Sequence, residues 1–480
     1  MRYHRNVPGY YVENFGCRAT QADGAALERQ FDERGLVRAS SPAQASVVVL
    51  NTCTVTATAD QDARAAIRRV QRQNPDAQIV VTGCYAQRAP EEIASLPGVS
   101  LVVGNSHKHQ LAEIAMSRDV ETRAASFVPL DVLTPFPQPS SSLGQMTDDE
   151  RPIFVSDIFA HTELLAAPVF DAANERTRPN LKVQDGCDNR CSFCVIPYVR
   201  GQSRSLQIQQ ILREVNTLVD SGYREVVISG INLGRWGRDL LVSSRQRPTT
   251  NHPRLTSLIR AILSETALEK LRISSVEPMD WSDELVALVA SSPRIAKHAH
   301  VPMQSGSDAV LRRMHRKYRP WHYREKIEQI RAAIPTAAIG ADVMVGFPGE
   351  TDAEFESTRR MIEELPFTYL HVFTYSARPG TPAASMPNQV PVHVARERNR
   401  VLRELASEKK LAFMRGFVGK TVEAIALHVT GNDNAGEFTE ALTDNYLKLH
   451  VRGRHEPNRW RKAHIEDVVD GALVGESLSS

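Results

Sequence analysis

The strongest constraint on the fold is an alternation of short β-branched runs with amphipathic helical stretches along most of the 480-residue chain. The first such runs are Gly9–Phe15, Ser46–Leu50 and Gln78–Thr82, with helical patterns at Thr20–Gly35 and Ala59–Arg72 between them. Strand–helix–strand units of this length predict parallel strands joined by right-handed crossovers. The sequence therefore predicts an α/β protein that begins with a parallel α/β domain at residues 1–120.

A cysteine follows each of these three runs almost at once, as Cys17, Cys53 and Cys84. Because the carboxyl ends of parallel strands lie along one edge of a sheet, we expect the three thiols to meet. One buried thiol would be ordinary, but three at the same topological position favour a three-thiolate metal site. Gly16 and Gly83 allow close approach of the backbone to a cluster, although they equally suit a plain strand-to-helix turn.

A second set of three thiols, Cys187, Cys191 and Cys194, lies in one C-x3-C-x2-C loop directly after the strand-like run Leu181–Asp185. Three thiolates in a short loop can ligate three irons of a cubic four-iron cluster and leave the fourth iron open. A zinc knuckle, a disulfide cluster and incidental cysteines are the alternatives. Zinc normally takes a fourth protein ligand, and no His or Cys lies near enough in sequence to supply it.

Composition sets broad limits on the class of protein. The net charge of +2 neither demands nor excludes nucleic acid. The amino-terminal residues lack a signal-peptide pattern, and no run approaches the ~18 apolar residues of a membrane span. We therefore expect a cytoplasmic protein with no membrane partner. In that reducing compartment the cysteines are better candidates for metal ligands than for disulfide bonds.

Residues 121–178 are rich in proline and serine and read as a connector without a chemical role. Residues 179–390 repeat strand and helix six times, which predicts a partial β/α barrel with its working groups at the strand carboxyl ends. Polar residues stand at those ends and are expected to bind a cofactor on the same rim as the cysteine loop: Gly230, Asn232, Ser275, Glu277, Gln304 and Asp342. No Gly-x-Gly-x-x-Gly or Walker-type loop appears, which argues against a dinucleotide cofactor or nucleotide hydrolysis.

The carboxyl-terminal part changes character. A charged helical connector is expected at 391–417, and its acidic residues favour an ordinary solvated face. Residues 418–480 contain short strands and a basic cluster, which predict a small oligonucleotide-binding β-barrel. The cluster comprises Lys448, Arg452, Arg454, Arg459, Arg461 and Lys462. A second candidate RNA contact is the basic run Arg312–Arg319, where Tyr318 could stack on bases; a basic loop without a partner is the alternative.

Taken together, these motifs resemble the radical S-adenosylmethionine methylthiotransferases, most nearly the branch acting on threonylcarbamoyladenosine in tRNA. The resemblance rests on VVVLNTCTV (47–55), VVTGCYAQ (80–87), KVQDGCDNRCSFCVIPYVRG (182–201), SSVEPMDW (274–281), PMQSGSD (302–308), GADVMVGFPGET (340–351) and YLHVFTYSARPGT (369–381). It implies a barrel of the radical SAM type and a carboxyl-terminal TRAM domain. Three departures stand out: Arg18-Ala-Thr20 replaces a common Lys-x-Asn, Arg204–Leu206 lacks a second Arg, and Leu240–Pro253 looks inserted.

By this resemblance, Cys187, Cys191 and Cys194 hold a 4Fe–4S cluster that binds S-adenosylmethionine and cleaves it to a deoxyadenosyl radical. That radical would take hydrogen from C2 of the adenine. Cys17, Cys53 and Cys84 would hold a second 4Fe–4S cluster that carries the sulfur to be methylated. The implied partners are tRNA, a small electron-transfer protein such as flavodoxin or ferredoxin, and a sulfur donor.

The implied reaction converts N6-threonylcarbamoyladenosine 3′ of the anticodon into its 2-methylthio derivative. Within the family, isopentenyladenosine in tRNA or an aspartate of a ribosomal protein are the alternative substrates. A zinc-dependent RNA-binding protein without catalysis is the alternative of another class.

Overall fold

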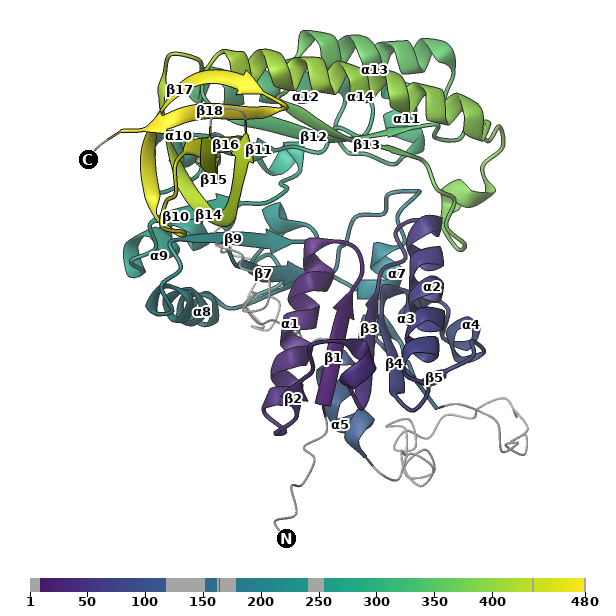
Figure 1. The fold of residues 1–480 in the computed structure, drawn as a ribbon. Coiled ribbons are helices and arrows are strands. Elements are labelled where there is room, and N and C mark those ends of the chain that lie inside the picture. Colours follow the sequence, from purple (N-terminus) through teal and green to yellow (C-terminus); the bar gives the residue numbers. More distant parts are fainter. Residues whose placement is uncertain are drawn as a thin grey trace. The chain divides into compact units, whose positions relative to one another are not determined.

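The computed structural model describes residues 9–117, 152–161, 164, 178–240, 254–433 and 436–478. The chain divides into two compact units: Met1–Leu165 with Tyr198–Gly201, and Ala166–Pro197 with Gln202–Ser480. Figure 1 traces the chain through both, from purple to yellow. Most of the expected connector and nearly all of the Leu240–Pro253 insertion lie outside the described residues. Among the described helices, none is long and apolar enough to cross a membrane.

The first unit is built on a six-stranded parallel sheet in the order β2-β1-β3-β4-β5-β6. Its strands are β1 (Gly9–Asn14), β2 (Val37–Arg38), β3 (Val47–Thr52), β4 (Gln78–Gly83), β5 (Val99–Gly104) and β6 (Ile153–Phe154). Its helices are α1 (Arg18–Asp32), α2 (Ala57–Gln73), α3 (Cys84–Arg88), α4 (Pro90–Ala94) and α5 (Leu111–Met116). The predicted parallel α/β layer is confirmed.

Both faces of this sheet are buried, as expected of parallel strands. On β3, Val48 and Leu50 pack with Ile67 of α2 in one core cluster. Val47 and Val49 point the other way and join a second cluster that contains residues of α1 and α5. The apolar run in β3 is therefore continuous because helices cover it on both sides.

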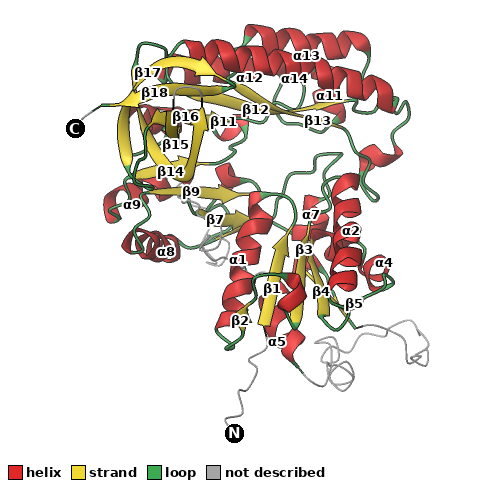
Figure 2. Cartoon of the chain, in the orientation of Figure 1, coloured by secondary structure: helices red, strands yellow, loops and turns green. Residues whose placement is uncertain are grey.

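The second unit contains the expected partial barrel of six parallel strands. These are β7 (Asn180–Asp185), β9 (Glu225–Gly230), β10 (Lys270–Ile273), β11 (His298–His300), β12 (Ala338–Val345) and β13 (Tyr369–Thr374), with the short antiparallel β8 (Arg204–Ser205) beside β7. A parallel bridge between Leu271 and Ile295 joins its two sheets. In Figure 2 the red helices follow the yellow strands in alternation.

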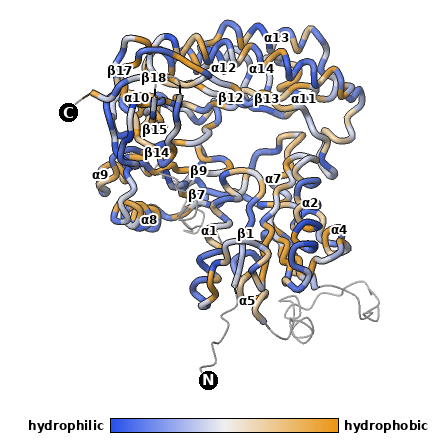
Figure 3. Tube along the Cα trace, viewed as in Figure 1, coloured by the Kyte–Doolittle hydropathy of each residue, from blue (hydrophilic) through white to orange (hydrophobic). Residues whose placement is uncertain are grey.

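The helices of this part are α8 (Ile208–Asp220), α9 (Leu255–Glu265), α10 (Asp283–Ser291), α11 (Asp308–Arg313), α12 (Pro320–Ala333) and α13 (Asp352–Glu364), and the short α7 (Ile196–Arg200) follows the cysteine loop. Figure 3 shows hydrophilic and hydrophobic segments alternating along them, as expected of helices with one buried face. The helix α14 (Val392–Arg415) then leads to the carboxyl-terminal strands.

A closed five-stranded barrel ends the chain, in the order β14-β15-β16-β18-β17. Its strands are β14 (Thr421–Asp433), β15 (Gly436–Thr443), β16 (Lys448–Arg452), β17 (Trp460–Val469) and β18 (Ala472–Ser477). Met414 and Phe417, at the end of α14 and just after it, pack into its core with Leu449 and Ile465. The predicted small β-barrel is confirmed.

The turn between β15 and β16 connects this small barrel to the partial barrel within the same compact unit. Asn445 donates a hydrogen bond from Nδ2 to the carbonyl oxygen of Thr336 over 2.9 Å. Tyr446 adopts a left-handed φ of 73°, and its ring centroid lies 5.2 Å from that of His298. The guanidinium of Arg272 lies 4.6 Å from the Tyr446 centroid. Tyr446 therefore packs at the amino-terminal end of the partial barrel, among the first residues of its strands.

Candidate active site with two sets of thiols

The first unit brings together the three thiols that follow its strands. Cys17 precedes α1, Cys53 follows β3, and Cys84 begins α3 directly after β4. Burial, together with the negative charges of Cys84 and Cys17, raises the pKa of Cys53 to about 12. Such mutual electrostatic effects act over short distances, so the three thiols lie close together although they are distant in sequence.

Hydrogen-bond donors point at these sulfurs. The backbone N–H of Val55 donates to Sγ of Cys53 over 3.5 Å, and Nδ2 of Asn105 donates to Sγ of Cys84 over 3.7 Å. The Thr20 hydroxyl lies 3.6 Å from Sγ of Cys17. Thr20 stands where the family commonly has Asn, and here its hydroxyl makes the contact with the sulfur. Donors of this kind favour the thiolate form that a metal requires.

Gly16 shows how closely the backbone approaches this thiol set. It has a φ of +99°, and an added Cβ would lie 2.6 Å from Cβ and 2.9 Å from Sγ of Cys53. Gly83 has the same φ, and a Cβ there would lie 2.3 Å from the carbonyl oxygen of Thr52. A larger residue at Gly16 would fill space beside the Cys53 sulfur, and one at Gly83 would clash with the backbone of the neighbouring strand. The close approach at Gly16 fits a compact inorganic cluster.

A buried network of charges lies near the same thiols. Asp23 accepts from Lys108 over 3.0 Å and from Arg200 over 2.9 Å, and all three side chains are buried. Burial lowers the pKa of Lys108, whereas Asp23 and the charge of Cys84 raise it. Two cations share one carboxylate, so the network is suited to anionic ligands close by. No local pattern predicts this network, because Asp23 and Arg200 stand 177 residues apart.

The second unit holds the other three thiols in the loop that follows β7. Burial raises the pKa of Cys194 to about 12, and the charges of Cys191 and Cys187 add to the rise. The backbone N–H of Asn189 donates to Sγ of Cys187 over 3.4 Å, and Nδ2 of Asn232 donates to the same sulfur over 3.7 Å. This loop therefore presents its thiols as a group as well.

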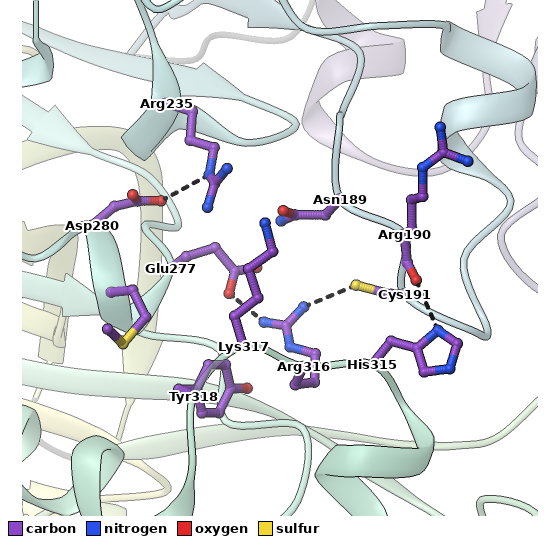
Figure 4. Close-up of a pocket in the computed structure, with 11 residues that line it drawn as sticks. Asn189, Arg190, Cys191, Arg235, Glu277, Asp280, His315, Arg316, Lys317 and Tyr318 are labelled. Atoms are coloured by element: carbon purple, nitrogen blue, oxygen red, sulfur yellow. Dashed lines mark hydrogen bonds and ion pairs between the residues drawn. The ribbon is translucent and has the colours of Figure 1, made fainter.

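Arg316 contacts a sulfur of this loop directly. Its Nη1 donates to Sγ of Cys191 over 3.3 Å, and its Nη2 pairs with the carboxylate of Glu277. Figure 4 shows the guanidinium between Glu277 and Cys191. Burial raises the pKa of Glu277, and the charge of Arg316 opposes that rise. A charged N–H donor held against a thiol stabilises negative charge on the sulfur.

The same contacts correct one prediction. Arg316 and Tyr318 belong to the basic run expected to touch RNA, yet both are buried. The Tyr318 hydroxyl donates to the carbonyl oxygen of Met303 over 2.7 Å, and its ring lies 5.0 Å from the Arg316 guanidinium. The prediction that Tyr318 stacks on bases is wrong, because internal partners occupy both side chains.

A pocket opens beside Cys191 (Figure 4). Its lining includes four cations, Arg190, Arg235, Arg316 and Lys317, and two carboxylates, Glu277 and Asp280. Asp280 and Arg235 approach to 3.6 Å. Both signs of charge next to the thiol complement a zwitterionic amino-acid group. Arg235 was not predicted from the sequence because an isolated basic residue gives no pattern. Arg316 and Lys317 were predicted as part of a basic run for RNA and not as pocket residues.

The six expected cofactor contacts fall in different places. Glu277 lines the pocket, and Asn232 contacts Cys187. Gly230 allows the Gln184 side chain to pack against the backbone, because a Cβ added at Gly230 would lie 2.7 Å from Oε1 of Gln184. Ser275, Gln304 and Asp342 instead gather around His300 or beside it. Ser275 Oγ lies 2.7 Å from Nδ1 of His300, and the backbone N–H of Gln304 donates to the Asp342 carbonyl over 2.8 Å.

Comparison with known proteins decides the family. Residues 9–104 match the uncharacterized protein family UPF0004, and residues 181–362 match the radical SAM superfamily. The Bacillus subtilis threonylcarbamoyladenosine tRNA methylthiotransferase MtaB is 35% identical over 444 residues, which cover 92% of this chain and 90% of the relative. The chain belongs to the radical SAM methylthiotransferase family. It is therefore a radical SAM enzyme whose cofactors are S-adenosylmethionine and 4Fe–4S clusters.

Other relatives carry a different name. The tRNA-2-methylthio-N(6)-dimethylallyladenosine synthase of Acidothermus cellulolyticus is 34% identical over 430 residues, which cover 89% of this chain and 79% of the relative. Among solved structures, the radical S-adenosylmethionine methyltransferase TsrM of Kitasatospora setae has a TM-score of 0.53 at 14% identity, covering 79% of this chain and 75% of that one. The latter likeness concerns the fold alone. The relatives in common identify a tRNA methylthiotransferase.

In the iron-free protein, iodoacetamide at about pH 8 is expected to modify Cys17 at least about tenfold faster than Cys53. Cys17 is exposed, whereas Cys53 is buried with its pKa raised to about 12, so less of it is the reactive thiolate. Peptide mass spectrometry over time measures both rates. In 6 M guanidinium chloride the two should react alike, and equal rates in the folded protein would contradict the described burial.

Proposed function

We propose that this enzyme converts N6-threonylcarbamoyladenosine 3′ of the anticodon of tRNA into its 2-methylthio derivative. The observation that carries the proposal is the pair of three-thiol sets in one chain, each at the carboxyl ends of parallel strands. Relatives named for this substrate support the choice of nucleoside. Dimethylallyladenosine is the second candidate, because relatives named for it reach 34% identity.

In this proposal Cys187, Cys191 and Cys194 hold one 4Fe–4S cluster, and Cys17, Cys53 and Cys84 hold the other. When bound, the first supplies the electron that cleaves S-adenosylmethionine, and the second supplies the sulfur. The chain's own residues position the reactants and exclude water. Arg235 and Lys317 suit the carboxylate of S-adenosylmethionine, while Glu277 and Asp280 suit its ammonium group. A small electron-transfer protein and a sulfur donor complete the reaction.

The tRNA is proposed to meet the basic side of the carboxyl-terminal barrel. Arg452 ends β16, Arg454 follows it as an exposed residue, and Arg461 lies on β17. Barrels of this size bind oligonucleotides through such surfaces. The arginines of α14 differ, because Arg400 pairs with Glu397 and Glu404 over 2.6 Å each.

Deleting the gene should remove the 2-methylthio threonylcarbamoyl nucleoside from tRNA, and the wild-type chain should restore it. Neither Cys191→Ala nor Cys53→Ala should restore it, because each breaks one thiol set. Nucleoside mass spectrometry of total tRNA measures the product.

The two variants should differ in vitro. Cys191→Ala is expected to form no deoxyadenosine, whereas Cys53→Ala is expected to cleave S-adenosylmethionine without sulfur transfer. Persistence of the nucleoside in the deletion strain would refute the substrate, and methylthiolation by Cys53→Ala would refute the two-cluster assignment.

Replacing Arg316 by Met should shift the midpoint potential of the cluster held by Cys191 to a more negative value. The substitution removes an N–H donor and a positive charge that stabilise the added electron. The measurement is an EPR-monitored redox titration in a Cys17/Cys53/Cys84→Ala background, which leaves one thiol set. Arg316→Lys should shift less, and Arg313→Met, whose arginine pairs with Glu354 instead, should not shift at all. An unchanged potential in Arg316→Met would exclude this role.

Replacing Arg452, Arg454 and Arg461 together by Gln should weaken tRNA binding and flatten its salt dependence. Each lost phosphate contact should reduce the slope of log K against log salt by about 0.7 to 0.9. Fluorescence anisotropy across a range of KCl concentrations measures the slope. The matched control replaces Arg396, Arg400 and Arg403, exposed arginines of α14. A slope altered only by the control set would move the RNA site to that helix.

A further inference from the structure

The lumen side of the partial barrel is polar, whereas its outer side is apolar. Pairing places Gly340 opposite Tyr369, Asp342 opposite His371, and Met344 opposite Phe373. A Cβ on Gly340 would lie 2.0 Å from the Tyr369 ring, so that ring crosses the lumen side. The intervening residues of β12 point outward and are completely buried: Ile339, Ala341, Val343 and Val345. The polar residues therefore share the inner face of this sheet.

Three of these inner side chains form a cluster, termed here the lumen triad: His300, Asp342 and His371. One ring nitrogen from each histidine and one carboxylate oxygen of Asp342 lie within 4.8 Å of one another. Nε2 of His300 lies 3.4 Å from Oδ1 of Asp342, and the rings of His300 and His371 are 5.6 Å apart. His371 is exposed and the Asp342 side chain is 26% exposed, so a ligand can reach the triad from the side of β13.

Buried polar atoms on other strands of the same lumen lack hydrogen-bond partners within the described part of the chain. They include Oγ of Ser229, Oγ of Ser274 and both terminal nitrogens of Arg272. Ser229 pairs with Lys182 on β7, and Arg272 packs over Tyr446 at the lumen floor. Leaving such groups unpaired is costly, so the lumen is built for a polar ligand. An apolar dimethylallyl group would leave them unsatisfied.

We propose that the lumen triad recognises the polar N6 substituent of the target adenine and selects threonylcarbamoyl over dimethylallyl. The inference rests on the proposed function and names its specificity site. His371 donates to the carboxylate, and Asp342 accepts from the hydroxyl or an amide N–H. Phe373, two residues beyond His371 on the same face and 36% exposed, offers an aromatic surface to the base. Relatives named for the two nucleosides are 35% and 34% identical to this chain, so we expect the discrimination to depend on particular residues.

The test compares dissociation constants of the anaerobic holoenzyme for anticodon stem-loops carrying threonylcarbamoyladenosine, dimethylallyladenosine or unmodified adenosine. Fluorescence anisotropy reports binding independently of turnover. In His371→Phe, affinity for the threonylcarbamoyl stem-loop should fall about 10- to 100-fold, since a hydrogen bond to a charged group is lost. Affinity for the unmodified stem-loop should change less than about twofold. His371→Gln, which keeps a donor, should lie between the two.

His322→Phe provides the matched control, because His322 is an exposed histidine of the outer helix α12. The proposal is overturned if His371→Phe keeps the wild-type preference, or if it weakens modified and unmodified stem-loops equally. One equivalent of a divalent metal present in the wild type and lost in His371→Phe would also overturn it. Failure of the proposed function looks different: the wild-type enzyme itself would methylthiolate the dimethylallyl and not the threonylcarbamoyl stem-loop.

Discussion

The conflict between burying a thiol and ionising it is the constraint on which the rest of this structure depends. Burial raises the pKa of Cys53 and of Cys194 to about 12, yet a metal binds the thiolate. The fold reduces the cost with donors that a protein already has at the carboxyl ends of its strands. Backbone N–H groups of Val55 and Asn189 point at sulfurs, and glycines let the backbone come close.

The two thiol sets differ in where their positive charge lies. In the first, Lys108 and Arg200 pair with Asp23 within the domain and interact electrostatically with the thiols. In the second, Arg316 contacts Cys191 directly and is anchored by Glu277. If the two sets hold the proposed clusters, a direct donor suits the cluster that must accept an electron, whereas charge held on a separate carboxylate leaves room for sulfur chemistry at the other.

Much of the fold follows from patterns that are local in sequence. The β-branched runs, the cysteines after them and the small carboxyl-terminal barrel were all predictable, because period and position in a β-α unit determine them. The burial of individual charged side chains was not predictable from the sequence. Arg316 belongs to a run that looks like an exposed basic loop, and only Glu277, 39 residues away, explains its burial. His371 was not predicted as a site residue, because its partners His300 and Asp342 come from two other strands.

The contact of Tyr446 with Arg272 and His298 gives the carboxyl-terminal barrel a second role. The small barrel places Tyr446 at the amino-terminal end of the partial barrel, besides carrying the basic residues that are proposed to meet tRNA. The small barrel is therefore not structurally independent of the partial barrel, and both belong to one compact unit. A chimera that exchanged this barrel between two methylthiotransferases would also exchange the residue packed against Arg272 and His298. The proposed RNA surface and the proposed specificity site would then change together.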